Sequence, residues 1–333
     1  MNKAFVKFLK FLPDRFVGAL LLMIVLAWAI PGIGSKDSFF NLKEVTQYAI
    51  ALLFFFYGLR LSPEKLVNDL RNWRLHLLIQ SITFVVFPVL VLLFYPFLKG
   101  TENEMLWLAV FFLAALPSTV SSSVVMVSIA KGNIPSAIFN ASISGVIGIV
   151  VTPLWMGFFL EKQAGSFDFS AIIADLFLTI LLPAIAGLIF HRFWGDWATR
   201  NNRYLGLYDK SVILSVVYSS FSDSFLNGIF QEISWFELFA LTASVVALFF
   251  IVYNLTKVSI RSFKFSREDQ ITILFCGSKK SLMHGSVIAG IIFAGSVNGS
   301  LFLVPIMIYH AFQLFYISIA AQNMGKLADS KLS

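Results

Sequence analysis

The chain has 333 residues, of which 58% are hydrophobic and only 13% charged, and its formal net charge is +7. Soluble domains are typically about 45–50% apolar and about 25% charged, so this composition excludes a soluble enzyme, a nucleic-acid-binding protein and a disordered scaffold. We expect a multi-pass membrane protein that has the lipid bilayer as its solvent and no nucleic-acid partner.

Ten apolar segments are long enough to cross a bilayer core of about 30 Å, which requires about 20 residues per helix. In chain order these predicted spans are 14–31, 41–59, 75–98, 105–130, 133–160, 170–191, 208–226, 236–258, 269–294 and 299–324. The sequence therefore predicts an all-α polytopic membrane protein with a single ten-helix transmembrane domain over residues 1–333.

Lysine and arginine sort strongly by side when the N-terminus is placed in the cytoplasm. Nineteen of the 25 basic residues then lie in cytoplasmic segments, four lie outside, and Lys279 and Lys280 lie within a span. Cytoplasmic loops carry the excess of positive charge in membrane proteins, and one span more or fewer would scramble the pattern. The sorting predicts that both termini are cytoplasmic, and we expect the bacterial inner membrane.

Ten spans divide into five plus five, which predicts two inverted repeats, residues 12–163 for spans 1–5 and 168–325 for spans 6–10. The fourth span of each repeat is interrupted by polar residues, at 115–123 and at 275–285. Pro117 removes a backbone donor from the first of them. Paired broken helices at matching repeat positions indicate a transporter site; the alternative is two kinked helices with ordinary packing.

Lys279 and Lys280 carry the sharpest signal. A lysine at the bilayer centre costs at least about 2.5–3.5 kcal/mol, and apolar residues flank this pair at 271–275 and 287–293. We expect at least one of them to face a polar cavity; the alternative is that span 9 is two interfacial segments whose lysines reach the headgroups.

Other polar residues within the spans are weaker candidates. Gln80 and Thr83 share a helix face, as do His310 and Gln313, and Asn140 lies in span 5; residues of this kind often join helices to each other. The candidate substrate- and ion-binding residues are Lys279, Lys280, Ser278, Ser281, His284, Ser118, Thr119, Ser121, Ser122, Ser123, Gln80, Thr83 and Asn140.

Several strings, in order and with characteristic spacing, give the chain a resemblance to a known family. They include Gly58-Leu59-Arg60-Leu61-Ser62, Leu75-His76-Leu77-Leu78-Ile79-Gln80, Pro117-Ser118-Thr119-Val120-Ser121-Ser122, Lys131-Gly132-Asn133, Ala137-Ile138-Phe139-Asn140, Val151-Thr152-Pro153-Leu154, and Phe275-Cys276 through Lys280-Ser281-Leu282. From about residue 12 to 325 the chain resembles the bile acid:sodium symporter family, most closely its divergent member-seven-type, SBF-like branch.

The resemblance implies a transporter with a panel domain of spans 1, 2, 6 and 7 and a core domain of spans 3–5 and 8–10. Broken spans 4 and 9 would cross near the midplane. Relatives move bile acids or other organic anions with sodium by rocking the core against the panel.

The departures from the family pattern concern the coupling ion. The sodium-coupled relatives have a glutamate and a Met-Gln-Asn run where this chain has 278–283, and their other ligand positions fall on Val124, Ala137 and Ala141. Of that ligand set only Ser123 is retained. We hypothesise that Lys279 or Lys280 replaces a bound cation, which would make transport independent of sodium or couple it to protons, because burial favours neutral lysine.

Two functions remain open. The first is secondary active transport of a small organic anion by alternating access, with sodium or protons as the coupling ion. The second is a regulatory, ligand-sensing membrane protein that affects ion homeostasis, for instance of calcium. A solute-sized polar cavity at the crossover would favour transport, and a sealed, packed crossover would favour regulation. We expect no enzymatic activity and no cofactor apart from Na⁺ as a coupling ion, in a monomer or homodimer.

Overall fold

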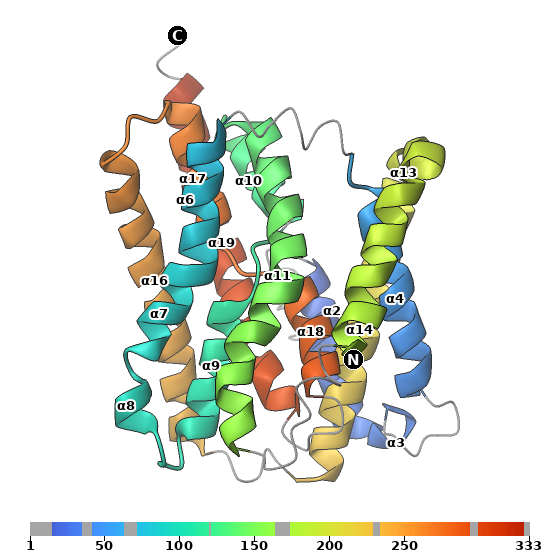
Figure 1. The fold of residues 1–333 in the computed structure, drawn as a ribbon. Coiled ribbons are helices and arrows are strands. Elements are labelled where there is room, and N and C mark those ends of the chain that lie inside the picture. The colour runs from blue at the N-terminus through green and yellow to red at the C-terminus, as the bar shows by residue number, and fades with distance from the viewer. Residues whose placement is uncertain are drawn as a thin grey trace, which may run out of the picture.

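The regular secondary structure is helical throughout the part of the chain that the structure describes (Figure 1). The computed structural model describes residues 15–34, 42–62, 72–119, 121–163, 174–228, 234–293 and 299–329. The helices are α2 Arg15–Ala29, α3 Pro31–Gly34, α4 Leu42–Leu59, α6 Trp73–Ser81, η2 Ile82–Val86, α7 Phe87–Leu92, α8 Tyr95–Leu98, α9 Glu104–Ala115, α10 Ser121–Ile129, α11 Ile134–Gln163, η3 Phe177–Leu181, α13 Leu182–Arg200, α14 Asn202–Leu226, α16 Trp235–Arg261, α17 Arg267–Gly277, α18 Leu282–Ile292, η4 Gly299–Phe302 and α19 Leu303–Asp329.

Five continuous helices of the described chain are long and apolar enough to cross a membrane. They are Trp73–Leu92, Ile134–Phe159, Ala174–Arg200, Trp235–Arg261 and Gly299–Leu327, and shorter apolar helices cover Gly18–Ala29, Glu44–Leu59 and Glu104–Ala115. Large apolar side chains also lie on the outside, among them Trp235, which is 87% exposed, and Phe97, which is 79% exposed. Such apolar surface fits lipid and not water. The protein is a polytopic membrane protein.

Predicted spans 4 and 9 are each interrupted near the middle, whereas the interruptions in spans 1 and 3 lie close to their ends. Span 4 consists of α9 and α10, and span 9 of α17 and α18, with the breaks close to the middle of the molecule's height in Figure 1. Parts of several predictions lie outside the described residues: the ends of spans 1, 2, 6 and 9, residue 120 of span 4, the starts of both repeats, and the basic residues Lys3, Lys7, Lys10, Lys36, Lys65, Arg71 and Lys331.

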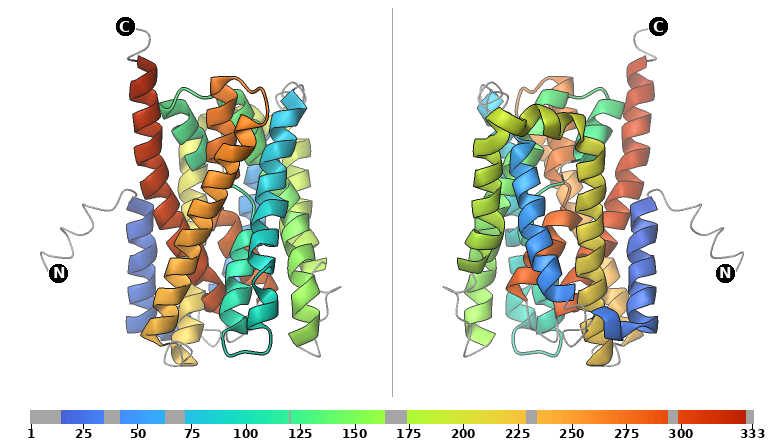
Figure 2. Two further views of the ribbon diagram at one scale, coloured as in Figure 1. Left: turned by 90° about the vertical axis from the view of Figure 1, so that its left-hand side faces the viewer. Right: turned by 90° about the vertical axis from the view of Figure 1, so that its right-hand side faces the viewer.

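One group of helices packs around α4, which lies between α13 and α14 in the right-hand view of Figure 2, with α2 beside α14. Gly58 permits the close approach of α4 to α13, because a Cβ there would collide with the carbonyl of Ala184. Arg60, which directly follows α4, forms an ion pair with Asp209 of α14 at 2.8 Å. Backbone contact and charge together therefore hold α4, α13 and α14 as a unit.

The remaining helices form a second group around the two breaks. α9 packs on α7 and α11, α17 packs on α6, α11 and α16, and α19 packs on α10, α16 and α18. Ser234 begins α16 with a capping box to Glu237, and Ser266 caps the N-terminus of α17, as serine commonly does at helix starts. This group contains every residue of the sequence-predicted site.

Candidate functional site at the two helix breaks

The first break is an extended segment between α9 and α10. α9 ends where Leu116 turns to extended backbone with ψ 154°, directly before Pro117, as is usual for the residue that precedes a proline. The second break runs from Ser278 to Ser281, between α17 and α18. The hydroxyl of Ser281 caps α18 by accepting from the main-chain N–H of His284 at 3.2 Å.

The two breaks are hydrogen bonded to each other. The main-chain N–H of Ser281 donates to the carbonyl of Pro117 at 2.8 Å. In the opposite direction, the hydroxyl of Ser118 donates to the carbonyl of Cys276 at 2.5 Å. Each break therefore supplies partners for backbone groups that the other leaves free, which is the condition for unwound backbone within a membrane.

The ammonium of Lys280 lies against the C-terminal end of α9. Its Nζ donates to the carbonyls of Ala114 at 2.6 Å and Leu116 at 2.7 Å, and to that of Thr83 at 2.7 Å. The ring of Phe87 lies 4.1 Å from the same Nζ. A lysine ammonium has three donors, so all three are used, at a helix end where the dipole favours a positive charge.

The carbonyl of Thr83 is available to Lys280 because the helix around it is irregular. In the π-helical turn η2, the N–H of Phe87 donates to the carbonyl of Ile82. The following residue, Pro88, has no N–H to give. The carbonyl of Thr83 is thereby released, while its hydroxyl donates to the carbonyl of Ile79 at 2.8 Å. Thr83 was predicted from its side chain, but it contributes its main chain.

The backbone of the second break is held by α19. Gln313 accepts from the N–H of Lys280 at 2.9 Å and donates to the carbonyl of the same residue at 2.8 Å. The hydroxyl of Tyr309 donates to the carbonyl of Ser278 at 2.8 Å. The hydroxyl of Ser278 donates to the main-chain carbonyl of Leu274 at 2.6 Å. The position of the Lys280 main chain is therefore fixed by two direct bonds.

Lys279 points to the other half of the first break and is less fully bonded. Its Nζ donates to the carbonyl of Ser122 at 2.9 Å, and this is its one hydrogen bond within the described residues. Close by, the hydroxyl of Thr119 is hydrogen bonded to those of Ser122 and Ser123, each at 2.8 Å. Two N–H donors of Lys279 remain for another group. The side chain of Ser121 lies outside the described residues.

The crossover residues are buried in this conformation. Lys279, Ser278, Ser123 and His284 have no exposed surface, and Thr119 is 5% exposed. Neither lysine reaches the surface, so the alternative in which they contact headgroups does not describe this conformation. The expectation of a polar cavity beside a lysine stays a prediction, and Lys279, with one bonded carbonyl, is the lysine to which it applies.

His284 lies where the second break meets α4 and α11. Its ring packs against the rings of Phe54 and Tyr57, at centroid distances of 5.9 Å and 5.4 Å. Its Nδ1 is hydrogen bonded to the Ser281 hydroxyl at 3.0 Å, whereas its buried Nε2 has no partner among the described residues. That nitrogen borders Gly145, where a Cβ would collide with it and with the hydroxyl of Tyr57.

Two predicted residues form a separate polar cluster between α6 and α11. Gln80 donates to the side-chain oxygen of Asn140 at 3.2 Å, and Asn140 is hydrogen bonded to His76 at 2.7 Å. Gln80 and Asn140 therefore join α6 to α11 in this conformation, and their role in binding stays a prediction.

Sequence reasoning missed the partners of the lysines. The main-chain carbonyls of Ala114 and Leu116 leave no mark in the residue type, and Gln313 was interpreted as a helix-joining residue. Two signals were available: Pro88, which must release a carbonyl one turn earlier, and Gln313 with Tyr309, which lie four residues apart on one helix face.

Comparison with known proteins matches residues 14–326 to the model of the SBF-like CPA transporter family. The chain belongs to this family. Among its relatives are "Uncharacterized protein PA2026" of Pseudomonas aeruginosa, 38% identical over 96% of this chain and 95% of the relative, and "Putative symporter YfeH" of Escherichia coli, 36% identical over 95% of this chain and 94% of the relative. "Sodium/bile acid cotransporter 7-B" of Xenopus laevis is 34% identical over 92% of this chain and 90% of the relative. The resemblance that the sequence strings indicated is thus confirmed.

The SBF-like family is a family of transporters. The residues at the two breaks of this member, 116–123 and 278–284, include no aspartate or glutamate. Hard cations in proteins are bound by oxygen atoms, and carboxylates are prominent among these ligands. The carbonyls of Thr83, Ala114 and Leu116 form a carbonyl cluster at the end of α9, and the ammonium of Lys280 occupies it.

Proposed function

We propose that the protein is a secondary active transporter of a small organic anion that works by alternating access. The observation that supports this most directly is the unequal bonding of the two buried lysines. Lys280 uses all three donors on main-chain carbonyls, whereas Lys279 uses one. Lys280 would replace a bound cation, and Lys279 would bind the anionic group of the substrate.

The proposed architecture has ten spans in two inverted repeats, 12–163 and 168–325. The panel consists of α2, α4, η3 with α13, and α14, which pack on one another; the core consists of the helices around the two breaks. His284, Tyr57 and Gly145 lie where α18 and α11 of the core meet α4 of the panel. Movement of the core against the panel would open this contact and expose the crossover to one side of the membrane at a time.

A lysine that takes the place of a cation has a consequence for coupling. An ammonium that is covalently fixed in the carbonyl cluster needs no sodium to neutralise the ends of the broken helices. Transport by this member would then be sodium-independent, or coupled to the protonation of a lysine. The name of the Xenopus laevis relative mentions sodium and bile acid, so sodium and an amphipathic organic anion are the first candidates for a test.

The decisive experiment is uptake into liposomes that contain the purified protein. Taurocholate and a series of small carboxylates and sulfonates are offered with a sodium gradient, with a proton gradient and with neither. We expect saturable uptake of at least one anion, lost in Lys279→Gln and retained in Lys326→Gln, a lysine exposed on α19. Equal uptake by the Lys279→Gln and Lys326→Gln variants would contradict the role of Lys279.

The buried crossover favours a second candidate function, a regulatory membrane protein that senses a ligand and affects ion homeostasis, for instance of calcium. In this conformation the described side chains at the breaks are buried, except Ser122 and Met283, which are partly exposed. Under this alternative the liposomes take up none of the anions, while deletion of the protein changes the calcium level in cells. Uptake by liposomes and its absence distinguish the two functions directly.

A further inference from the structure

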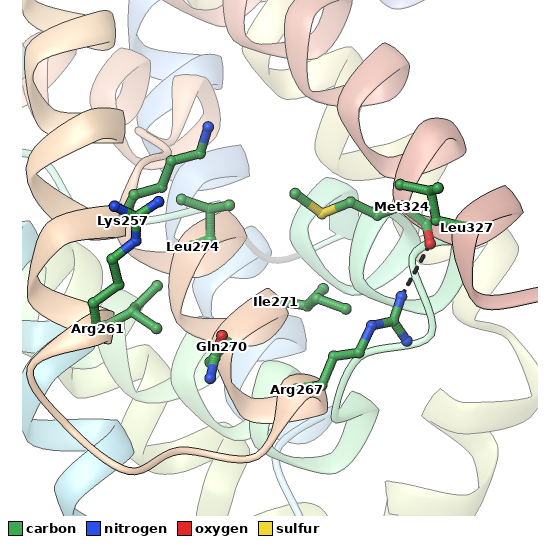
Figure 3. A pocket seen from close by; sticks show the side chains of 9 residues that line it. Lys257, Arg261, Arg267, Gln270, Ile271, Leu274, Met324 and Leu327 are labelled. Carbon is green, nitrogen blue, oxygen red and sulfur yellow. Dashed lines mark hydrogen bonds between the residues drawn. The ribbon is translucent and has the colours of Figure 1, made fainter. Parts of the chain in front are cut away.

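A cavity of about 410 Å³ lies between α16, α17 and α19, away from the crossover. Its apolar wall includes Ile260, Ile271 and Leu274, which are buried. Its basic side chains are Lys257 and Arg261 from α16 and Arg267 from α17. Figure 3 shows Lys257 and Arg261 on one side of the cavity and Arg267 on the other, with Ile271 and Leu274 between them.

The charge that lines the cavity is entirely positive, because none of the lining residues is acidic. Within the described residues, the side chain of Arg261 makes no hydrogen bond or ion pair, and the ammonium of Lys257 lies over the ring of Tyr253, 4.5 Å from its centroid. Arg267 donates to the carbonyl of Met324 at 3.0 Å (Figure 3), which leaves most of its five donors available. The cavity is therefore suited to an anion.

The position of the cavity indicates what kind of anion it is. It lies where α16 ends, α17 begins and α19 approaches its end, at one end of the helices in Figures 1 and 2. Neighbouring apolar side chains face outwards: Val258 is 59% exposed and Leu327 is 62% exposed. A ligand that fits must bring a negative charge together with an apolar body.

We propose that this cavity binds one anionic phospholipid, with its phosphate between Arg261 and Arg267 and an acyl chain along Ile260, Ile271 and Leu274. Arginine binds phosphate oxygens in pairs of parallel hydrogen bonds, and basic pockets between membrane helices are typical of anionic headgroups. A zwitterionic headgroup brings its own cation into a site that already contains three, so an anionic lipid is preferred. Binding here is independent of the proposed transport.

The experiment measures lipid retention and thermal stability of the purified full chain in detergent. Phosphatidylglycerol is added, with phosphatidylcholine, inorganic phosphate and glycerol 3-phosphate as separate comparisons. We expect phosphatidylglycerol to raise the melting temperature by mass action and to remain bound in native mass spectrometry, one molecule per chain. Neutralising one arginine should weaken its binding by about fivefold, the usual contribution of one basic side chain near an anionic lipid.

Arg261→Gln is the first variant, because Arg261 has no described partner to lose. Arg267→Gln and the double variant follow, and Arg200→Gln and Arg203→Gln, exposed on α13 and α14, are the matched controls. Equal retention of the two lipids by the unmodified protein would overturn the proposal, as would equal losses in variants and controls. An identical stabilisation by inorganic phosphate alone would overturn the assignment of a lipid.

Discussion

The main-chain N–H of Ser281 donates to the carbonyl of Pro117 at 2.8 Å, so the two broken helices are joined backbone to backbone. These residues are far apart in the chain, and each belongs to a segment that has lost its own helical hydrogen bonds. Because both segments lie within apolar surroundings, neither break is stable without the other. The crossover is therefore one structural unit, and the predictions below test its parts separately.

Lys280→Met should destabilise the protein. Methionine fills most of the volume but leaves the carbonyls of Thr83, Ala114 and Leu116 without their donor. Hydrogen bonds to a charged group contribute about 1.5–3 kcal/mol each, and removal of the buried charge offsets part of the loss. We expect a net loss of at least about 1.5–3 kcal/mol in unfolding measured in detergent. Lys326→Met, at an exposed position, should change little; equal stability of the two variants would contradict the structural role of Lys280.

Lys279→Gln should behave differently from Lys280→Met. The amide of glutamine still donates a hydrogen bond, and Lys279 has only the carbonyl of Ser122 to satisfy. The free energy of unfolding should change by less than about 1.5 kcal/mol, the upper value for one typical bond. Anion-dependent thermal stabilisation should be lost. A variant that still responds to the anions of the unmodified protein would place the substrate elsewhere.

Gln313→Met tests the connection between α19 and the second break. The substitution conserves volume but removes both hydrogen bonds to the main chain of Lys280. Each buried main-chain group left without a partner costs about 1–3 kcal/mol, so we expect a clear fall in melting temperature. Gln322→Met, at an exposed position of the same helix, is the control. If the two variants have the same melting temperature, the two hydrogen bonds between Gln313 and Lys280 contribute nothing measurable to stability.

Gly145→Ala should disturb the contact between α11, α4 and α18. The added Cβ would collide with Tyr57 and His284, and overpacking of this kind typically costs about 1–3 kcal/mol. Gly206→Ala is the matched control, because no atom lies within 4 Å of a Cβ at that position in α14, where alanine favours the helix by about 0.5–1 kcal/mol. The melting temperature should fall for Gly145→Ala and rise for Gly206→Ala. A Gly145→Ala variant that is more stable than the unmodified protein would contradict the close packing at Gly145.

The sequence located both breaks because the residues that cause them are visible in it. Pro117 ends α9 through its missing donor and its effect on Leu116, and serine at Ser281 begins α18 by capping it. The membrane character followed from composition, and the family from short strings. Three features stay predictions: the ten-span count, the cytoplasmic termini and the inverted repeats. They depend on the sorting of basic residues by membrane side, and helix positions alone do not show on which side a loop lies.

The two lysines show the boundary between what sequence and tertiary structure decided. Sequence alone determined that Lys279 and Lys280 are in an apolar span and must be bonded, because an unpaired ammonium there is too costly. Only the tertiary structure decided that Lys280 is saturated and Lys279 is not. The acceptors are main-chain carbonyls that any residue type provides, and one of them, on Thr83, is 197 residues away in the chain. A π-helical turn and a helix end release these carbonyls, and packing alone brings them to one ammonium.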